Sequence, residues 1–245
     1  MSRTFKLTLA YDGTDFAGWQ LQATDRTVQA VVEDALAPFE GRRVVVTAAG
    51  RTDAGVHAHG QVVSFALDAA LSVEQLQTAL NATLPRDVRV MAAEQAAPTF
   101  NARFDAKHKT YRYSIFCNDV VPPLERRQVW HVPTPLVAGA MQDAARMLIG
   151  TYDFAAFQAA GGDVVTSVRE VLDSRLTVHG ETWVYEITGS GFLRHMVRNI
   201  IGTLVDIGRG RWPAEEMRAI LESRHRSRAA ATAPPHGLTL WRVGY

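Results

Sequence analysis

The sequence predicts an α+β fold, in which strands and helices alternate along the chain. Residues 5–9 alternate apolar and polar side chains with the period of a strand, whereas apolar residues from 28 to 39 recur at helical spacing. From residue 107 onward the order of strands and helices is repeated, although no sequence repeat relates the two halves. At 245 residues, the chain is large enough to bury a core without disulfides or metals.

The elements of the first half follow from local signals. Thr27 is placed to begin a helix, because a hydroxyl before an apolar-periodic run is a typical N-cap. Residues 43–48 and 61–67 are rich in β-forming side chains and predict strands. Ser72, with a glutamine three residues later, forms a capping-box pattern, and the helix that it begins should stop before Pro85.

The second half begins with a strand over residues 107–116, where apolar and polar side chains alternate. Thr134-Pro135 is expected to open a helix and Gly150 to close it. The remaining predicted elements are a hairpin of residues 172–178 and 183–187 that turns at His179-Gly180, a helix over residues 193–207 and another that starts at Pro213.

The composition favours a protein of a reducing compartment. The chain has one cysteine, Cys117, which excludes an internal disulfide and a thiolate zinc cluster. No stretch approaches the ~20 apolar residues that a membrane-spanning helix requires. We therefore expect a cytoplasmic protein with no membrane partner, and a packing role for Cys117.

The net charge of +1 conceals an uneven distribution. Residues 1–100 hold eight Lys or Arg against eleven Asp or Glu, so the basic excess lies in residues 101–245. A basic excess is typical either of a solvated surface or of one that binds nucleic-acid phosphates. The basic residues of this part gather in two clusters, namely Arg103, Lys107, Lys109, Arg112, Arg126 and Arg127, and Arg209, Arg211, Arg224, Arg226 and Arg228.

The stretch from Gly50 to Ala58 has a composition that does not suit a buried core. It combines two glycines, an arginine and an aspartate within nine residues. Glycines permit backbone conformations that other residues avoid and let a ligand approach the main chain. Asp53 in this setting is either a turn or cap residue or part of a functional site. The long connection between the flanking strands favours a functional loop.

Five segments, in order along nearly the whole chain, resemble the tRNA pseudouridine synthase A family. The segment GRTDAGVHA at residues 50–58 resembles the catalytic-aspartate motif of that family. The other four are YDGTDFAGWQ at residues 11–20, FNARF at 100–104 with KTYRY at 109–113, GFLRHMVRNIIG at 191–202 and TAPPHGLTL at 232–240.

The resemblance implies two related α+β subdomains that share one continuous, mostly antiparallel sheet, with the active-site cleft between them. Residues 1–104 would form the N-terminal subdomain with the catalytic loop, and residues 105–245 the C-terminal subdomain with a basic RNA-binding surface. It implies a cofactor-free isomerase that converts uridine to pseudouridine at positions 38–40 of the tRNA anticodon stem-loop. It also implies a homodimer in which one tRNA touches both subunits.

The resemblance further implies the site residues. The reaction needs a carboxylate near C1′ of the ribose, a cation to keep that carboxylate ionised and an aromatic face for the flipped base. Asp53 matches the catalytic carboxylate, acting as nucleophile or general base, and Arg198 matches its ion-pair partner. Tyr111 matches the tyrosine that stacks on the uracil. Arg51 is expected to hold RNA phosphate or to order the loop.

The residues alone leave two of these assignments open. Arg194 precedes Arg198 by one turn on the same expected helical face, so spacing does not distinguish them. We prefer Arg198 because it belongs to the Arg-Asn-Ile core of the motif. Tyr111 shares a strand face with Tyr113, so an ordinary packing role for this aromatic remains open.

Two other functional classes are compatible with parts of the sequence. Asp53, His57 and His59 are ligand types that divalent metals accept, and His-x-His on a strand would place both rings on one face, as in a metal-dependent hydrolase. No further cluster of ligands with comparable spacing accompanies them, so we expect no metal. A non-catalytic RNA-binding module is the third possibility. The presence of Asp53, Tyr111 and Arg198 together favours the isomerase.

Overall fold

The computed structural model describes residues 2–161 and 165–245. By its internal contacts the chain divides into two compact units. Unit 1 comprises Met1–Lys107 together with Leu240–Tyr245, and unit 2 comprises His108–Thr239. Residues 240–245 thus group with the first unit, whereas the predicted division places every residue after 104 in the second subdomain.

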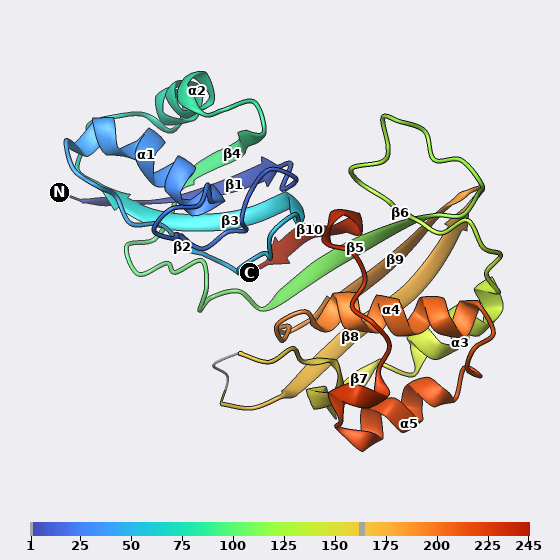
Figure 1. Ribbon diagram of the computed structural model, residues 1–245. Helices are drawn as coiled ribbons and strands as arrows, with labels where there is room; N and C mark the ends of the chain where they lie inside the picture. The colour runs from blue at the N-terminus through green and yellow to red at the C-terminus, as the bar shows by residue number, and fades with distance from the viewer. Residues whose placement is uncertain (1, 162–164) are drawn as a thin grey trace. The chain divides into compact units, whose positions relative to one another are not determined.

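Unit 1 is an antiparallel sheet with two helices on the same side of it (Figure 1). Its strand order is β4-β1-β3-β10, and the short β2 pairs with β3. The helices are capped as the sequence predicts, since the Thr27 hydroxyl accepts the Ala30 N–H and the capping box of Ser72 is present. The elements are β1 Arg3–Tyr11, α1 Val28–Glu40, β2 Thr47–Ala48, β3 His57–Leu67, α2 Val73–Thr83, β4 Val88–Gln95 and β10 Leu238–Gly244.

The core of unit 1 lies between the sheet and these helices. Phe5, Leu7 and Leu9 of β1 are fully buried, which confirms the alternation seen in the sequence. The strand β4 is not predicted from the sequence, because only Val88 and Val90 alternate as in a strand and the following run Met-Ala-Ala-Glu has the composition of a helix. Pairing along β1, from Phe5 opposite Gln95 to Tyr11 opposite Val88, overrides that local preference.

Two strand boundaries in unit 1 differ from the prediction. The strand expected at residues 43–48 is reduced to Thr47–Ala48, and the strand expected at 61–67 begins already at His57. The connection between them is therefore residues 49–56, shorter than the sequence suggests. Asp53 consequently lies in a compact turn and not in a long loop.

Unit 2 is built on a sheet of strand order β5-β9-β8-β7, with β6 parallel to β5 and the other pairs antiparallel. The mostly antiparallel α+β class is thus confirmed. Figure 1 shows α3 and α4 side by side. The elements are β5 His108–Phe116, β6 Trp130–His131, α3 Ala138–Arg146, β7 Gly150–Asp153, β8 Val168–His179, β9 Thr182–Gly189, α4 Met196–Gly208 and α5 Glu216–Ser223, with short 3-10 turns at Ala155–Phe157, Arg226–Arg228 and Pro235–Gly237.

The predicted hairpin of unit 2 is confirmed, but its turn lies one residue later than expected, at Gly180 and Glu181, because His179 still pairs with Thr182. Ser174 pairs with Ile187, Leu176 with Tyr185 and Val178 with Trp183. The chain turns through Gly180, whose φ of 59° suits glycine. Leu172 falls at a register shift between Val171 and Asp173, and it is half exposed.

The prediction for α3 is wrong at both ends. The helix begins at Ala138 and not at Thr134, because the backbone of Val137 is extended (φ −94°, ψ 98°) and its N–H donates to the Gly208 carbonyl at 2.8 Å. It ends at Arg146, and Gly150 does not cap it but begins β7, opposite Val171. Helices α4 and α5 also begin three residues later than expected, at Met196 and Glu216.

Candidate active site

Asp53 is the first residue of a tight turn between β2 and β3. The Val56 N–H donates to the Asp53 carbonyl oxygen at 3.1 Å, and Gly55 has a φ of 76°. A type II turn requires such a left-handed φ at its third residue, which glycine adopts without strain. The second glycine of the motif is therefore needed to form the turn that carries Asp53.

The segment from Tyr11 to Gln20 holds this turn by its backbone. The Trp19 N–H donates to the Thr52 carbonyl at 3.0 Å, and the Gly55 N–H donates to the Phe16 carbonyl at 3.3 Å. Gly18 lies so close that an added Cβ would stand 2.8 Å from the Thr52 carbonyl oxygen, and its φ is +97°. The motifs at residues 11–20 and 50–58 thus pack against each other and together surround Asp53.

Buried side chains fix the residues on either side of Arg51. The Tyr11 hydroxyl and the Thr52 hydroxyl are hydrogen bonded at 2.8 Å, and Gln61 Nε2 donates to the Gly50 carbonyl at 2.7 Å. Burial raises the pKa of Tyr11 to about 12, although its hydrogen bonds to Thr52 and Gln61 oppose the shift. Tyr11 therefore stays neutral and remains a hydrogen-bonding hydroxyl at any physiological pH.

Three successive residues of the turn have different surroundings. Arg51 is exposed, Thr52 is buried and Asp53 is half buried. The buried Thr52 anchors the segment between the exposed Arg51 and the half-buried Asp53. This arrangement leaves a cation and a carboxylate on a rigid backbone.

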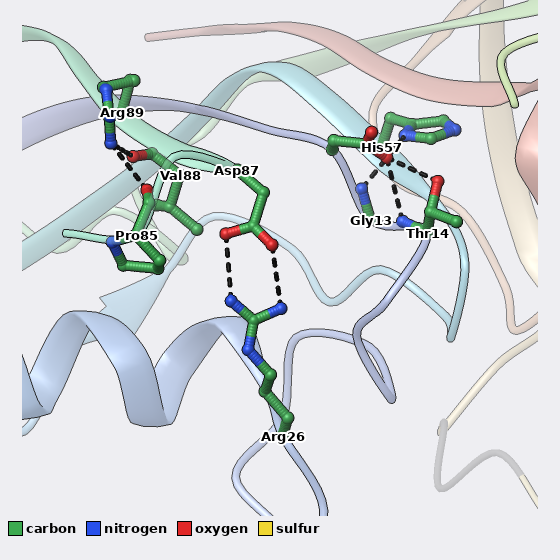
Figure 2. Close-up of polar contacts among 9 residues, drawn as sticks. Gly13, Thr14, Arg26, His57, Pro85, Asp87, Val88 and Arg89 are labelled. Atoms are coloured by element: carbon green, nitrogen blue, oxygen red, sulfur yellow. Dashed lines mark hydrogen bonds and ion pairs between the residues drawn. The ribbon is translucent and has the colours of Figure 1, made fainter.

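The segment before α1 is braced against the start of β4. Arg26 binds the Asp87 carboxylate with both terminal nitrogens, at 2.8 and 3.0 Å (Figure 2). Its guanidinium carbon lies 4.0 Å from the centre of the Phe16 ring. The Asp12 N–H donates to the Asp87 carbonyl at 3.0 Å. A bidentate pair fixes both position and angle of the partners. It therefore also stabilises the segment against which the Asp53 turn packs.

His57 and His59 lie in different surroundings. His57 is buried, and its Nδ1 accepts the Gly13 N–H at 3.0 Å (Figure 2). The same Nδ1 lies 3.1 Å from Asp12 Oδ1, so the ring is held between the main chain of Gly13 and the Asp12 carboxylate. His59 is exposed, and its ring stacks on Trp241 at 4.2 Å between centroids.

The metal-ligand hypothesis gains no support from this arrangement. Within residues 2–161 and 165–245, no group of three or more His, Cys, Asp or Glu side chains has the spacing to hold a metal ion. His57 is engaged with the main chain of Gly13, which orients its ring. His57 thus binds the main chain beside the Asp53 turn, and His59 packs on Trp241 at the surface of unit 1.

Tyr111 is buried on β5, opposite Ile187 of β9. Its ring meets the edge of Phe192 at 5.1 Å between centroids and an interplanar angle of 83°. Phe192 belongs to the motif that precedes α4, so this contact joins two of the segments that the sequence singles out. An edge-to-face pair fixes the ring of Tyr111 in one orientation.

Tyr113, on the same face, has a structural role. It is fully buried, and its hydroxyl donates to the Pro234 carbonyl at 2.8 Å. Burial raises the pKa of Tyr113, while the positive charge of Arg198 lowers it in part. Arg198 therefore acts electrostatically on the strand that carries Tyr111.

Arg198 stands in the first turn of α4. Its Nε donates to the Ala233 carbonyl at 2.8 Å, and its own carbonyl accepts the Ala233 N–H at 3.1 Å. The neighbouring Asn199 is fully buried and accepts from Arg226 at 3.0 Å and from the Thr232 hydroxyl at 2.7 Å. The last two motifs of the sequence are thus bound to each other through α4.

Arg194 is separated from Arg198 by the structure. The expectation that both share a helical face is wrong, because α4 begins only at Met196. Arg194 donates to the Ala160 carbonyl at 2.9 Å and also approaches the Gly161 carbonyl. Its guanidinium thereby orders a loop within unit 2.

The structure places the predicted site residues in two groups. Arg51 and Asp53 lie in unit 1, and Tyr111 and Arg198 lie in unit 2. Each group is held by its own motifs, and the ion pair of Asp53 with Arg198 stays a prediction. The sequence analysis assigned no role to Tyr11, Thr52 or Gln61, although Tyr11 and Thr52 belong to two of the motifs. Their hydrogen bonds depend on how β1, β3 and the Asp53 turn come together, which the sequence does not show.

A family model described as tRNA pseudouridine synthase matches residues 8–105 and 144–245. Arg51, Asp53 and Arg198 lie inside the matched ranges, and Tyr111 lies between them. The chain therefore belongs to the tRNA pseudouridine synthase family, whose members are isomerases that convert uridine to pseudouridine.

Proteins named tRNA pseudouridine synthase A are similar over almost the whole chain. That of Moorella thermoacetica is 47% identical over 98% of both chains, and that of Anoxybacillus flavithermus is 45% identical over 99% of both. Among solved structures, a Cbf5-Nop10-Gar1 complex matches 97% of this chain and 49% of that one at 12% identity, with a TM-score of 0.40, which is too low to support an assignment. No helix of the described residues is long and apolar enough to cross a membrane.

Proposed function

We propose that this chain converts uridine to pseudouridine at positions 38–40 of the tRNA anticodon stem-loop, with Asp53 as the catalytic carboxylate. The observation that carries the proposal is the Asp53 turn, which two separate motifs fix in unit 1 while Asp53 itself stays half buried. A reacting carboxylate needs both a fixed position and access to substrate. The family membership supports the reaction class.

The reaction is an isomerisation with balanced atoms. The N1–C1′ bond of uridine breaks, the uracil turns, C5 bonds to C1′ and the C5 proton is lost while N1 gains one. Positive character develops at C1′ as the first bond breaks, as in glycoside cleavage. Asp53 would act there as a nucleophile on C1′ or as a base towards the sugar. No electrons enter or leave, so the chemistry requires no cofactor.

Arg198 would keep Asp53 ionised. A cation in the first turn of a helix adds to the positive field of the helix N-terminus, and this arrangement favours a nearby anion. The Nε contact with Ala233 orients the guanidinium, and α4 places it near β5. An ion pair with Asp53 would lower the pKa of the carboxylate, since an opposite charge favours the ionised form.

Tyr111 would stack on the flipped uracil, and Arg51 would hold a phosphate. The edge contact with Phe192 keeps the Tyr111 ring in one plane, as a stacking surface requires. Arg51 is exposed two residues before Asp53, where a guanidinium can bind RNA without entering the core. A homodimer in the cytoplasm, in which one tRNA contacts both subunits, completes the proposal.

The test is Asp53→Asn, with Asp34→Asn on the exposed face of α1 as the matched control. We expect no pseudouridine from Asp53→Asn in unmodified tRNA, while the affinity for tRNA changes less than about threefold, because loss of a carboxylate from a phosphate-binding surface adds no repulsion. Asp34→Asn should behave as the unaltered protein. Chemical mapping of pseudouridine and a filter-binding titration measure the two effects.

Three outcomes would contradict the proposal. Ordinary turnover by Asp53→Asn would remove Asp53 from the chemistry. Activity that is lost in a chelator would favour a metal-dependent hydrolase, and tRNA binding without any pseudouridine would leave an RNA-binding module. The target positions are tested with three tRNA substrates, in which cytidine replaces uridine at position 38, 39 or 40. Each substrate should lose pseudouridine at the replaced position only.

A further inference from the structure

Phe104 presents an aromatic ring to solvent at the edge of unit 1. The residue is 75% exposed, and Arg103 and Lys107 near it are exposed as well. A single exposed apolar residue needs no explanation on its own. Hydrogen bonds around Phe104, however, fix the backbone that carries the ring.

The turn that carries Phe104 is closed by side-chain hydrogen bonds. Asn101 Oδ1 accepts the N–H groups of Arg103 and Phe104 at 3.0 and 3.2 Å. Asp105 Oδ2 in turn accepts the Asn101 N–H at 2.9 Å, and the Asp105 N–H donates to the Asn101 carbonyl at 3.0 Å. These four bonds hold the backbone on both sides of Phe104.

Ala102 anchors the same turn to the core. It is fully buried, its N–H donates to the Ser64 hydroxyl at 3.0 Å, and its carbonyl accepts from the Tyr245 hydroxyl at 2.8 Å. Ala102 is thus fixed in the core, whereas the next two residues, Arg103 and Phe104, are exposed. A ring that is exposed on a rigid turn loses little conformational entropy on binding.

The neighbours of Phe104 indicate the partner. The Arg103 guanidinium carbon lies 5.4 Å from the centre of the Phe104 ring, and the exposed Lys107 adds a second positive charge. A docking surface for a protein would need a broad apolar area, whereas this turn offers one ring among charged side chains. An aromatic face next to cations is how proteins bind unpaired bases and their phosphates.

We propose that Phe104 stacks on an unpaired base of the RNA substrate and that Arg103 binds the adjoining phosphate. This contact uses a different aromatic residue from Tyr111 of the proposed uracil site, and it rests on the proposed function for the identity of the RNA. Stacking tolerates any base, because every base has an aromatic face. Phe104 therefore contributes affinity for the RNA and takes no part in the chemical step.

The experiment compares Phe104→Ala, Phe104→Trp and Arg103→Ala in the full chain, with Leu124→Ala as control because Leu124 is 95% exposed elsewhere. We expect Phe104→Ala to weaken tRNA binding about 5- to 100-fold and Phe104→Trp to retain binding within about threefold. Arg103→Ala should reduce the slope of log affinity against log salt by about one, whereas Phe104→Ala should leave that slope unchanged. Leu124→Ala should bind as the unaltered protein.

The single-turnover rate at saturating tRNA separates binding from chemistry, and it should stay within about twofold in Phe104→Ala. Unchanged affinity in both Phe104→Ala and Arg103→Ala overturns the inference. A change in sedimentation of Phe104→Ala also overturns it, since the ring would then belong to a contact between subunits. If the unaltered protein forms no pseudouridine, the proposed function fails, but weaker RNA binding by Phe104→Ala would still support the stacking contact.

Discussion

At the scale of single residues, the buried hydroxyl of Thr52 connects the stability of unit 1 with the position of Asp53, the proposed catalytic carboxylate. Thr52 adjoins Asp53 in the chain, and it shares a hydrogen bond with Tyr11 inside unit 1. A polar atom that is buried here has no access to water, so loss of its partner costs the full desolvation of the group. This contact therefore helps to fix the backbone that carries the Asp53 side chain.

Tyr11→Phe tests this connection. We expect it to reduce the free energy of unfolding by about 1–3 kcal/mol, because the Thr52 hydroxyl is left without this bond. It should also reduce kcat with little change in KM, since the turn that carries Asp53 loosens while the RNA contacts remain. Urea unfolding and steady-state pseudouridine formation measure the two quantities.

Tyr185→Phe is the matched control for this prediction. The Tyr185 hydroxyl is equally buried and pairs with Ser174 at 2.8 Å in unit 2. A similar loss of stability with unchanged kcat is expected there. Adding Thr52→Val to Tyr11→Phe should restore part of the stability, because both partners are then apolar. If the two tyrosine variants lose kcat equally, the special role of Tyr11 is wrong.

At the scale of elements, helix α4 organises the second group of site residues. Its first turn carries Arg198, its buried Asn199 binds Arg226 and Thr232, and Gly202 lies directly against the backbone of Ala231. A side chain at Gly202 would overlap the Ala231 carbonyl oxygen. The glycine is thus present because two backbones meet there, and not for its flexibility.

Gly202→Ala should therefore destabilise the protein, although alanine is the better helix former. We expect a loss of about 2–4 kcal/mol from overpacking against backbone, together with lower activity as the segment holding Arg198 moves. Gly139→Ala in α3 is the control, because apart from its chain neighbours and the backbone of its own helix no described atom lies within 4 Å of an added Cβ. That variant should gain about 0.5–1 kcal/mol by thermal unfolding. A neutral Gly202→Ala would contradict the packing described for α4.

The sequence predicts elements well where the local signal and the tertiary contact agree. Thr27 and Ser72 cap their helices as expected, and the hairpin register of Ser174 with Ile187 is correct. The strand β4 is missed because pairing with β1 decides it, and α3 is misplaced because Val137 bonds to Gly208. Arg194 is misjudged for the same reason, since a bond to the Ala160 carbonyl does not follow from helical spacing.

At the scale of the whole molecule, charge is divided along the chain. Residues 1–100 are slightly acidic and the remainder is basic, while the total is close to neutral at +1. A protein of this kind binds nucleic acid through local basic surfaces and not through its net charge. The basic residues after residue 100, which include Arg103, together with Arg51 are the candidates for phosphate contacts.

Salt dependence of tRNA binding tests this view. If about six phosphates are contacted, affinity should fall about a thousandfold between 50 and 200 mM salt, since each contact releases counterions. Filter binding at several salt concentrations gives the slope. A flat response would mean that phosphate contacts contribute little, and the basic clusters would then be solvated surfaces only.

The grouping of residues 240–245 with unit 1 has a consequence for synthesis. Those residues supply Trp241 beside His59, the Gly244 carbonyl that accepts from Lys107, and Tyr245, which bonds to Ala102. They leave the ribosome only after all of unit 2, which at 5–20 residues per second takes roughly 7 to 26 s. During that time β3 of the nascent unit 1 has no β10 beside it. The half of the protein that carries Asp53 is translated first and completed last.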